Sequence, residues 1–233
     1  MEYVTHRERN PFGLDPPCER FVPGYGDVNA RFHVVGDNPA VHGGTETGIP
    51  FTGRPWSKRF VGALADGGLV ETVDPGTVTD CPGTFLSYLS MCPPDAVDTD
   101  TADRDRLYAR MEPYFDAELR AITAHVLLPV GPRATRHVLE TCTARATDQS
   151  PESLHAETLS GAGWLVVPVA DPTGWTGDDA GRLVDTLRGL EEENYREQSD
   201  LGRFLPGEEP YLVRCARRHG RPGTVSGRPG PAS

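Results

Sequence analysis

The chain has 233 residues, of which 37% are hydrophobic, enough for the core of one large α/β domain or of two small ones. Its 34 acidic and 23 basic residues give a formal net charge of −11, and Lys58 is the only lysine. Bulk charge therefore argues against a general affinity for nucleic acid, so any contact with DNA has to be local. The acidity fits a protein adapted to a high-salt cytoplasm and, equally, an ordinary acidic cytosolic protein whose code favours arginine.

Targeting and cysteine signals are weak. No apolar run reaches eighteen residues, and residues 1–13 lack the apolar stretch of a signal peptide, which predicts a cytoplasmic chain without a membrane span. The cysteines are odd in number and contain no C-x-x-C pair, which argues against a disulfide framework or a zinc ribbon. We expect them to be small buried hydrophobes; they are Cys18, Cys81, Cys92, Cys142 and Cys215.

Short apolar runs alternate with amphipathic stretches along the chain, which is typical of an α/β sheet with crossover helices. Buried strands are predicted at residues 31–36, 84–90, 124–131 and 163–170. Helices are predicted at 55–68, at 98–122, through Ala134, Val138 and Leu139, and from Asp178 onward. The predicted fold class is α/β, with three layers and a central, mostly parallel sheet of four strands between helices.

A single domain is predicted for residues 1–205. Residues 206–233 are rich in Arg, Gly and Pro, and we expect a disordered tail that is either only solvated or in contact with a polyanion. The protein is expected to be a monomer.

Two loops that follow predicted strands have unusual composition. Residues 37–55 are rich in glycine and proline, and residues 171–177 read DPTGWTG. In parallel sheets, the loops that leave the carboxyl ends of strands build the site, so these two loops are its expected location. The chain has neither a G-x-x-x-x-G-K-[ST] motif nor a G-x-S-x-G motif, which excludes a P-loop and an esterase-type nucleophile elbow.

The first loop and its strand resemble a known family. The stretch FVPGYGDVNARFHVVGDNPAVHGGTETGIPFTG is similar to the first motif region of the uracil-DNA glycosylase superfamily, above all of its families 4 and 5. Those families run from V-x-G-x-G-x-x-x-A into a strand, then G-E-x-P-G or G-x-A-P with a following H-G, then T-G-x-x-F-x-G. The downstream order is also similar, through SYLSMCPP, EPYFDAELRAI, LLPVGPRATRHVL and VVPVADPTGWTG, so the resemblance spans residues 18–190.

The resemblance implies the uracil-DNA glycosylase fold and an enzyme that flips a deaminated base out of DNA and hydrolyses its N-glycosidic bond. The leaving base gains negative charge, so the site needs hydrogen-bond donors and a carboxylate or amide that holds water. Asp37 sits at the position of the first-motif carboxylate, and Asn38 offers an amide beside it. Either residue is expected to hold the water.

The same loop is expected to contact the base. Phe51 sits at the position of the ring that stacks on the flipped base, unless it is a core phenylalanine. His42 matches the H-G of family 5, and is either a donor or phosphate contact or a histidine satisfied within the loop. The other substrate-binding positions expected here, with backbone amides of the glycine pair as anion contacts, are Gly36, Pro39, Gly43 and Gly44.

Two positions depart from the family pattern. The second-motif histidine is replaced by Asp171, at a catalytic position, where a carboxylate would repel a departing anionic base unless it is protonated or turned away. The asparagine that reads the base edge corresponds to Ser87 or Tyr88, depending on a gap. The identity of the base therefore stays open.

The expected DNA contacts lie beside these motifs. Thr173, Gly174 and Trp175 fall where such enzymes insert a side chain into the gap left by the flipped base. Trp175 is either this stacking wedge or a cover over the end of the sheet. Arg54 is expected to reach a phosphate, unless it is a solvated side chain.

No cofactor is expected. Family 4 builds an iron–sulfur cluster from four cysteines. Cys18 and Cys92 fall near two of those ligand positions, but Met111 occupies a third and no second N-terminal cysteine exists. We therefore expect neither a cluster nor another metal site.

The leading hypothesis is a single-function DNA repair glycosylase that excises a deaminated base, uracil first, from DNA. The alternative is a degenerate relative that binds nucleic acid or a nucleotide without cleavage, as Asp171 suggests. A pocket that acts on some other N-glycoside is a third reading.

Overall fold

The computed structural model describes residues 9–74, 76–94, 101–122, 124–143 and 149–192. The predicted tail at 206–233, the domain boundary at 205 and the first residues of the predicted helix at 98–122 lie outside the described residues. None of the helices in the described ranges combines the length and the apolar character that a membrane crossing requires.

The core of the fold is a six-stranded sheet in the order β1-β3-β2-β4-β6-β5. The strands are β1 (Tyr25–Gly26), β2 (Phe32–Gly36), β3 (Thr84–Tyr88), β4 (Val126–Pro129), β5 (Leu159–Gly161) and β6 (Trp164–Val166). The four predicted strands are β2, β3, β4 and β6, and they run parallel. The predicted count of four was too low, because β1 and β5 add two- and three-residue antiparallel edge strands. Strands this short have too few residues for an alternating pattern to be recognisable.

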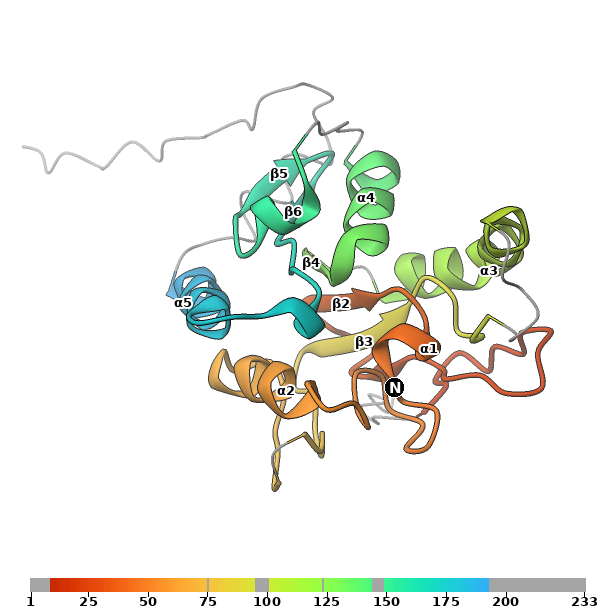
Figure 1. Ribbon diagram of the computed structural model, residues 1–233, viewed down its shortest axis with the longest axis horizontal. Coiled ribbons are helices and arrows are strands. Elements are labelled where there is room, and N and C mark those ends of the chain that lie inside the picture. The colour runs from red at the N-terminus through yellow and green to blue at the C-terminus, as the bar shows by residue number, and fades with distance from the viewer. Residues whose placement is uncertain (1–8, 75, 95–100, 123, 144–148, 193–233) are drawn as a thin grey trace, which may run out of the picture.

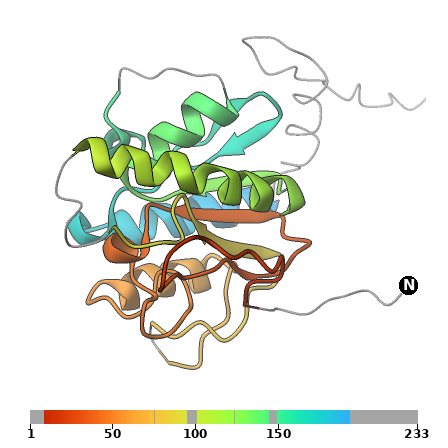
Figure 2. The same ribbon diagram turned by 90° about the vertical axis from the view of Figure 1, so that its right-hand side faces the viewer.

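Helices cover both faces of this sheet, so the fold is the predicted three-layer α/β architecture (Figure 1). Helices α2 (Ser57–Asp66) and α5 (Asp179–Glu192) lie on one face, and α3 (Thr101–Ile122) and α4 (Gly131–Cys142) on the other. Figure 2 shows the same layers edge-on. The short elements are α1 (Pro39–His42) and the 3₁₀ turns η1 (Pro151–Leu154) and η2 (Pro172–Gly174).

The register of β2 and β3 decides which side chains face which layer. Side chains alternate along a strand. Val34 and Tyr88 belong to the core on the side of α2 and α5, whereas Val35 packs with Phe115 of α3. Since Val35 pairs with Ser87, the side chain of Ser87 also faces α3. Neighbouring residues at the end of β3 therefore serve opposite faces.

Cys18 and Cys92 form a disulfide, with their Cα atoms 6.1 Å apart. The expectation that these two are unpaired buried hydrophobes was therefore wrong. They are 74 residues apart in the sequence, and only the fold brings their segments together, through a backbone hydrogen bond of 2.9 Å from Val22 N to Met91 O. Cys81 is buried in the core and Cys142 is half-buried; Cys215 lies outside the described residues.

Candidate functional site

The turn after β2 begins the site. Asn38 caps α1, since its side chain accepts a hydrogen bond of 3.1 Å from Val41 N, and Pro39 occupies the first turn. A four-residue helix has no stability of its own, and Arg54 ties it down by donating from Nη2 to the carbonyls of Pro39 (3.3 Å) and Ala40. The guanidinium of Arg54, expected at a phosphate, is thus engaged with backbone.

His42 lies at the end of α1 and is fully buried. Its Nδ1 accepts a hydrogen bond of 2.9 Å from the backbone N–H of Asp37. A neutral ring with Nδ1 as acceptor carries its proton on Nε2, and Nε2 has no hydrogen-bond partner among the described residues. Burial lowers the pKa of His42 although Asp171 and Asp37 act in the opposite direction, so the ring is neutral and presents a buried N–H donor.

Gly131, at the start of α4, lies beside this donor. Its φ of +82° is in the left-handed region, and a Cβ added there would lie 3.4 Å from His42 Nε2 and 3.9 Å from Asp171 Oδ2. The unpaired donor and a carboxylate oxygen thus both lie close to Gly131. Gly131 was not predicted as a site residue, because the sequence pattern of α4 does not indicate that its start lies beside the first loop.

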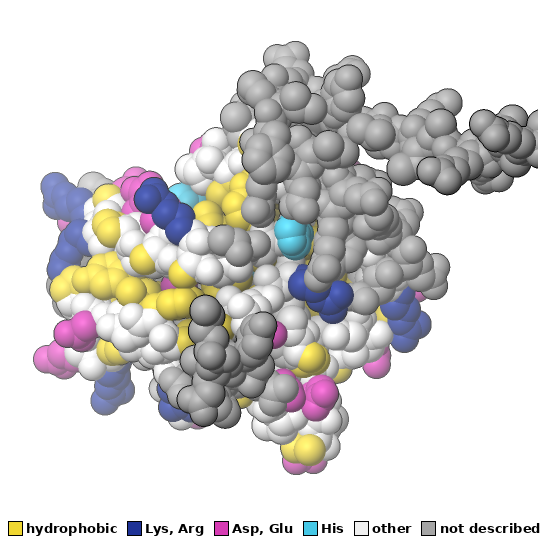
Figure 3. Space-filling model, turned by 180° about the vertical axis from the view of Figure 1, so that it is seen from behind, with side chains coloured by type: hydrophobic (Ala, Val, Ile, Leu, Met, Phe, Trp, Pro, Cys, Tyr) yellow, Lys and Arg dark blue, Asp and Glu magenta, His cyan; other side chains and the backbone are white. Residues whose placement is uncertain are grey.

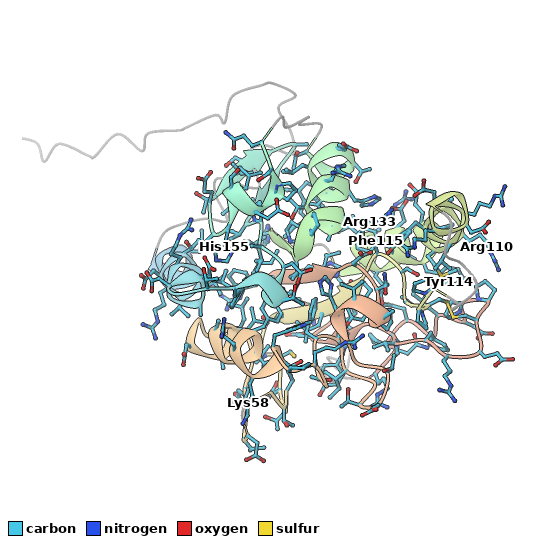
Figure 4. All side chains as sticks on the ribbon, viewed as in Figure 1. Lys58, Arg110, Tyr114, Phe115, Arg133 and His155 are labelled. Atoms are coloured by element: carbon cyan, nitrogen blue, oxygen red, sulfur yellow. A yellow bond between two sulfur atoms is a disulfide. The ribbon has the colours of Figure 1, made fainter. Side chains whose placement is uncertain are left out.

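Asp37 is held by a tyrosine that sequence reasoning missed. Tyr108 on α3 donates from its hydroxyl to Asp37 Oδ1 and accepts a hydrogen bond of 2.8 Å from Asn38 Nδ2. Burial raises the pKa of Tyr108, and the carboxylate of Asp37 raises it further, so the phenol keeps the proton that it donates. Arg133 extends from α4 toward α3, with its guanidinium 4.3 Å from the centroid of the Tyr108 ring (Figure 4). Tyr108 carried no motif signal, because it lies 71 residues from its partner.

Phe51 is fully buried and adopts a φ of +66°. Its ring centroid lies 5.4 Å from that of Tyr88 and 5.7 Å from that of His42. The Tyr88 hydroxyl accepts a hydrogen bond of 2.8 Å from Phe51 N and lies 3.0 Å from the carbonyl oxygens of both His42 and Gly43. Burial raises the pKa of Tyr88, which keeps the phenol neutral. The ring expected to stack on a base is therefore covered by another side chain of this chain.

Tyr88, not Ser87, faces the site. Ser87 Oγ is hydrogen-bonded to His33 Nε2 at 2.7 Å on the opposite face of the sheet, under α3. The two alternatives for the base-reading position are thus separated by the alternation of β3. Gly36, paired with Tyr88, has no room for a side chain, since a Cβ there would lie 2.7 Å from the Tyr88 ring and 2.8 Å from His42 Nδ1.

The glycine pair after α1 makes internal hydrogen bonds. Gly43 N donates to Pro39 O at 2.9 Å, and Gly44 N donates to Thr52 O at 2.8 Å. Both residues have φ near the left-handed region, at +85° and +87°. In this conformation their amides close the loop and do not point outward to an anion, contrary to the expectation.

The second-motif loop is also fixed by its own side chains. Asp171 caps η2, since its Oδ1 accepts hydrogen bonds from the backbone N–H (2.9 Å) and the hydroxyl (2.7 Å) of Thr173. His155 (Figure 4) fixes the segment that leads into this loop. Its Nδ1 accepts a hydrogen bond of 3.1 Å from Ala170 N, and its Nε2 lies 2.8 Å from Asp179 O. Thr173 and Gly174 remain exposed.

Trp175 is 6% exposed, so an exposed wedge is not what the structure contains. Its Nε1 donates to Ala170 O at 2.9 Å, and its ring packs against Phe60 and His155 at centroid distances of 5.7 and 5.5 Å. Arg59 Nη1 donates to the carbonyl of Trp175 at 2.6 Å. In this conformation Trp175 therefore covers the end of the sheet, which is the second of its two predicted roles.

Basic side chains form no obvious footprint on the face seen in Figure 3, where those of the described residues are dispersed among acidic and apolar ones. This agrees with the formal net charge of −11.

The cysteines near the family 4 ligand positions do not fit a cluster. A cluster of that kind needs four thiolates, whereas Cys18 and Cys92 are joined to each other. They line a cavity of about 180 Å³ together with the thioether residue Met111, and no other cysteine of the described residues lines it.

Comparison with known proteins places the fold and these motifs in one family. The profile of the Uracil DNA glycosylase superfamily matches residues 23–181. The chain therefore belongs to the uracil-DNA glycosylase superfamily, a class of DNA glycosylases, as the motifs predicted.

Within this class, the chain is similar to proteins named Type-5 uracil-DNA glycosylase. The one from Pyrobaculum aerophilum is 30% identical over 173 residues, which cover 72% of each chain. The one from Thermus thermophilus is 35% identical over 95 residues (40% of this chain and 43% of that protein). The one from Mycobacterium bovis is 29% identical over 130 residues (54% and 46%), so the match spans less than half the length of that relative.

Proposed function

We propose that this protein excises a deaminated base, uracil first, from DNA by hydrolysis of the N-glycosidic bond. The observation that carries the proposal is that the site contains both a carboxylate fixed by a hydrogen bond and a buried N–H donor without a partner among the described residues. Tyr108 binds one carboxylate oxygen of Asp37, and the proton on Nε2 of His42 is buried and without a partner among the described residues. The names of the relatives, Type-5 uracil-DNA glycosylase, support the same reaction class.

The two groups match the two needs of the reaction. Asp37 uses its second oxygen to orient a water toward C1′. The bond from C1′ to the base breaks with its electron pair leaving on the base, while the water oxygen bonds to C1′ and its proton passes to Asp37. The neutral His42 donates a hydrogen bond from Nε2 to an oxygen of that base, where negative charge develops. In this proposal the donor to the base is His42 of the first-motif loop, because Asp171 replaces the histidine of the second motif.

A second function, base or nucleotide binding without cleavage, is favoured by Asp171. Its Oδ1 caps η2, and its Oδ2 lies close to Gly131, the residue that also lies beside His42 Nε2. An ionised carboxylate there raises the free energy of an anionic leaving base by repulsion. His42 serves both functions as a base contact.

We expect Asp37→Asn to lower the rate of base release by about 10²- to 10⁴-fold, the range for loss of a positioned general base. The assay measures free base released from labelled oligonucleotides that contain uracil, hypoxanthine or xanthine, at low and molar potassium chloride. Asp185 is an exposed residue on α5, and Asp185→Asn serves as the matched control, which is expected to leave the rate unchanged.

Asp171→Asn separates the two functions, since asparagine keeps an acceptor for Thr173 and removes the charge. Faster release by Asp171→Asn supports excision with Asp171 as a brake. Oligonucleotide binding by the wild type, measured by fluorescence anisotropy, together with no release by the wild type or Asp171→Asn, replaces the excision proposal by the binding one.

A further inference from the structure

The side chain of Tyr88 is planar and lies beside His42 and Phe51, where the proposed function requires a base to bind. It is fully buried, and its ring lies against Phe51 and, nearly parallel at an interplanar angle of 27°, against His42. Gly36 beneath it has no side chain and allows the close approach. The position between these residues, called the base seat below, is filled by the Tyr88 side chain.

The hydrogen bonds of the phenol define what else fits this seat. Its oxygen accepts from Phe51 N, and its proton goes to the carbonyl of His42 or of Gly43, both at 3.0 Å. A six-membered ring with a C=O next to an N–H reproduces both bonds: its oxygen accepts from Phe51 N and its N–H donates to one of the carbonyls. In a nucleotide, where N1 carries the sugar, uracil offers this lactam edge at N3–H, whereas cytosine has an acceptor nitrogen at N3 beside its C=O.

We propose that Tyr88 is a built-in occupant of the base seat, so that a lactam base binds only when the Tyr88 side chain has left it. The identification of the seat as the one for the base rests on the proposed function; the occupancy does not. A base that enters has to replace three backbone contacts of a buried phenol. Wild-type protein therefore has low affinity for free base and releases base from DNA slowly.

The test is binding of small rings to seat variants. Tyr88→Ala empties the seat, Tyr88→Asn empties it and retains a polar group, and Tyr88→Phe keeps it filled as the matched control. The probes are 4-methylphenol and two N1-methylated bases, 1-methyluracil (the uracil probe) and 1-methylcytosine (the cytosine probe), at millimolar concentration. Methylation at N1 removes the second N–H/C=O edge that free cytosine would offer. The readouts are the shift in melting temperature and the heat of binding by calorimetry. Circular dichroism establishes that each variant is folded, and Tyr88→Asn replaces Tyr88→Ala if the latter is not.

We expect 4-methylphenol and the uracil probe to raise the melting temperature of the emptied variants, the uracil probe binding at least tenfold tighter than the cytosine probe, with no shift in the wild type or Tyr88→Phe. Binding of the uracil probe with equal strength to the wild type and to the emptied variants overturns the proposal. So does an emptied, folded variant that binds 4-methylphenol but not the uracil probe, because the seat is then an ordinary core position.

The same variants in the base-release assay keep this inference apart from the proposed function. Binding of the uracil probe by an emptied variant without release from DNA supports the occupied seat and refutes excision. Release from DNA by the wild type at the rate of Tyr88→Asn or faster, without binding of the uracil probe by the variant, refutes the occupied seat and leaves excision standing.

Discussion

Raising the pH from 4.5 to 8 is expected to lower the free energy of unfolding through Glu118 by roughly 5 kcal/mol. Glu118 lies on α3 and is 1% exposed, and neither carboxyl oxygen has a partner of hydrogen-bond geometry among the described residues. Burial raises its pKa to about 8, against the smaller opposing effects of the Gly24 backbone and the Ser87 hydroxyl. An ionised carboxylate without firm hydrogen bonds is costly in such a place.

The sign follows from the two states. The unfolded chain releases the Glu118 proton near pH 4.5, while the folded chain keeps it up to about pH 8. The unfolded state therefore binds fewer protons across this window, and stability falls as the pH rises through it. Below pH 4.5 the contribution is complete, and above pH 8 it is lost.

His33, buried on the same face, has the opposite dependence. Burial lowers its pKa to about 3, so its contribution is present above pH 6.5 and is lost as the pH falls toward 3. A stability curve of the wild type alone mixes the two groups. The difference between the wild type and Glu118→Gln isolates the carboxyl group, since glutamine does not titrate.

The measurement is urea unfolding of the wild type, Glu118→Gln and Glu112→Gln at intervals from pH 5 to 8. Glu112 is an exposed glutamate on the same helix, and its variant is expected to follow the wild-type curve. Over this range the wild type is expected to lose most of the roughly 5 kcal/mol relative to Glu118→Gln, because His33 contributes equally to both proteins. Parallel curves for all three proteins would show that Glu118 is ionised and solvated in the folded state.

The parallel strands and their crossover helices were predictable because their signals are local. Apolar runs marked β2, β3 and β4, and the glycine pair at 67 and 68 marked the end of α2. Helix α1 was not predicted, because its cap, Asn38-Pro39, was interpreted as a site motif and not as a helix start. Edge strands of two or three residues had no such signal.

The candidate site was predictable in its position and not in its contacts. Asp37 and His42 lie where the loop after β2 was expected to build the site, and Asp171 approaches from the second loop. Tyr108 and Gly131 come from α3 and α4, and their roles arise from tertiary packing that no spacing encodes. Trp175 illustrates the same limit, because a tryptophan after a strand has the same sequence whether it is a wedge or a cover.

Reduction of the Cys18–Cys92 disulfide is expected to lower the free energy of unfolding by about 4 kcal/mol, since the bond closes a loop across a separation of 74 residues. For a domain of this size that corresponds to a fall of roughly 10 °C in melting temperature. The clamped loop also carries the hydrogen bond of 3.1 Å from Ser90 N to Asp37 O, so its release loosens the backbone of the candidate site.

Thermal unfolding with and without dithiothreitol is the measurement, on the wild type, Cys18→Ser, Cys92→Ser and the control Cys142→Ser. The reductant should lower the melting temperature of the wild type and of Cys142→Ser to that of Cys18→Ser, and it should leave Cys18→Ser unchanged. A wild type that is insensitive to the reductant and whose two thiols react with a maleimide before unfolding would mean that the cysteines are unpaired in solution. In that case the loop that holds Asp37 is fixed by packing and backbone hydrogen bonds alone, and Cys18→Ser is expected to cost no more than an ordinary substitution of a half-buried residue.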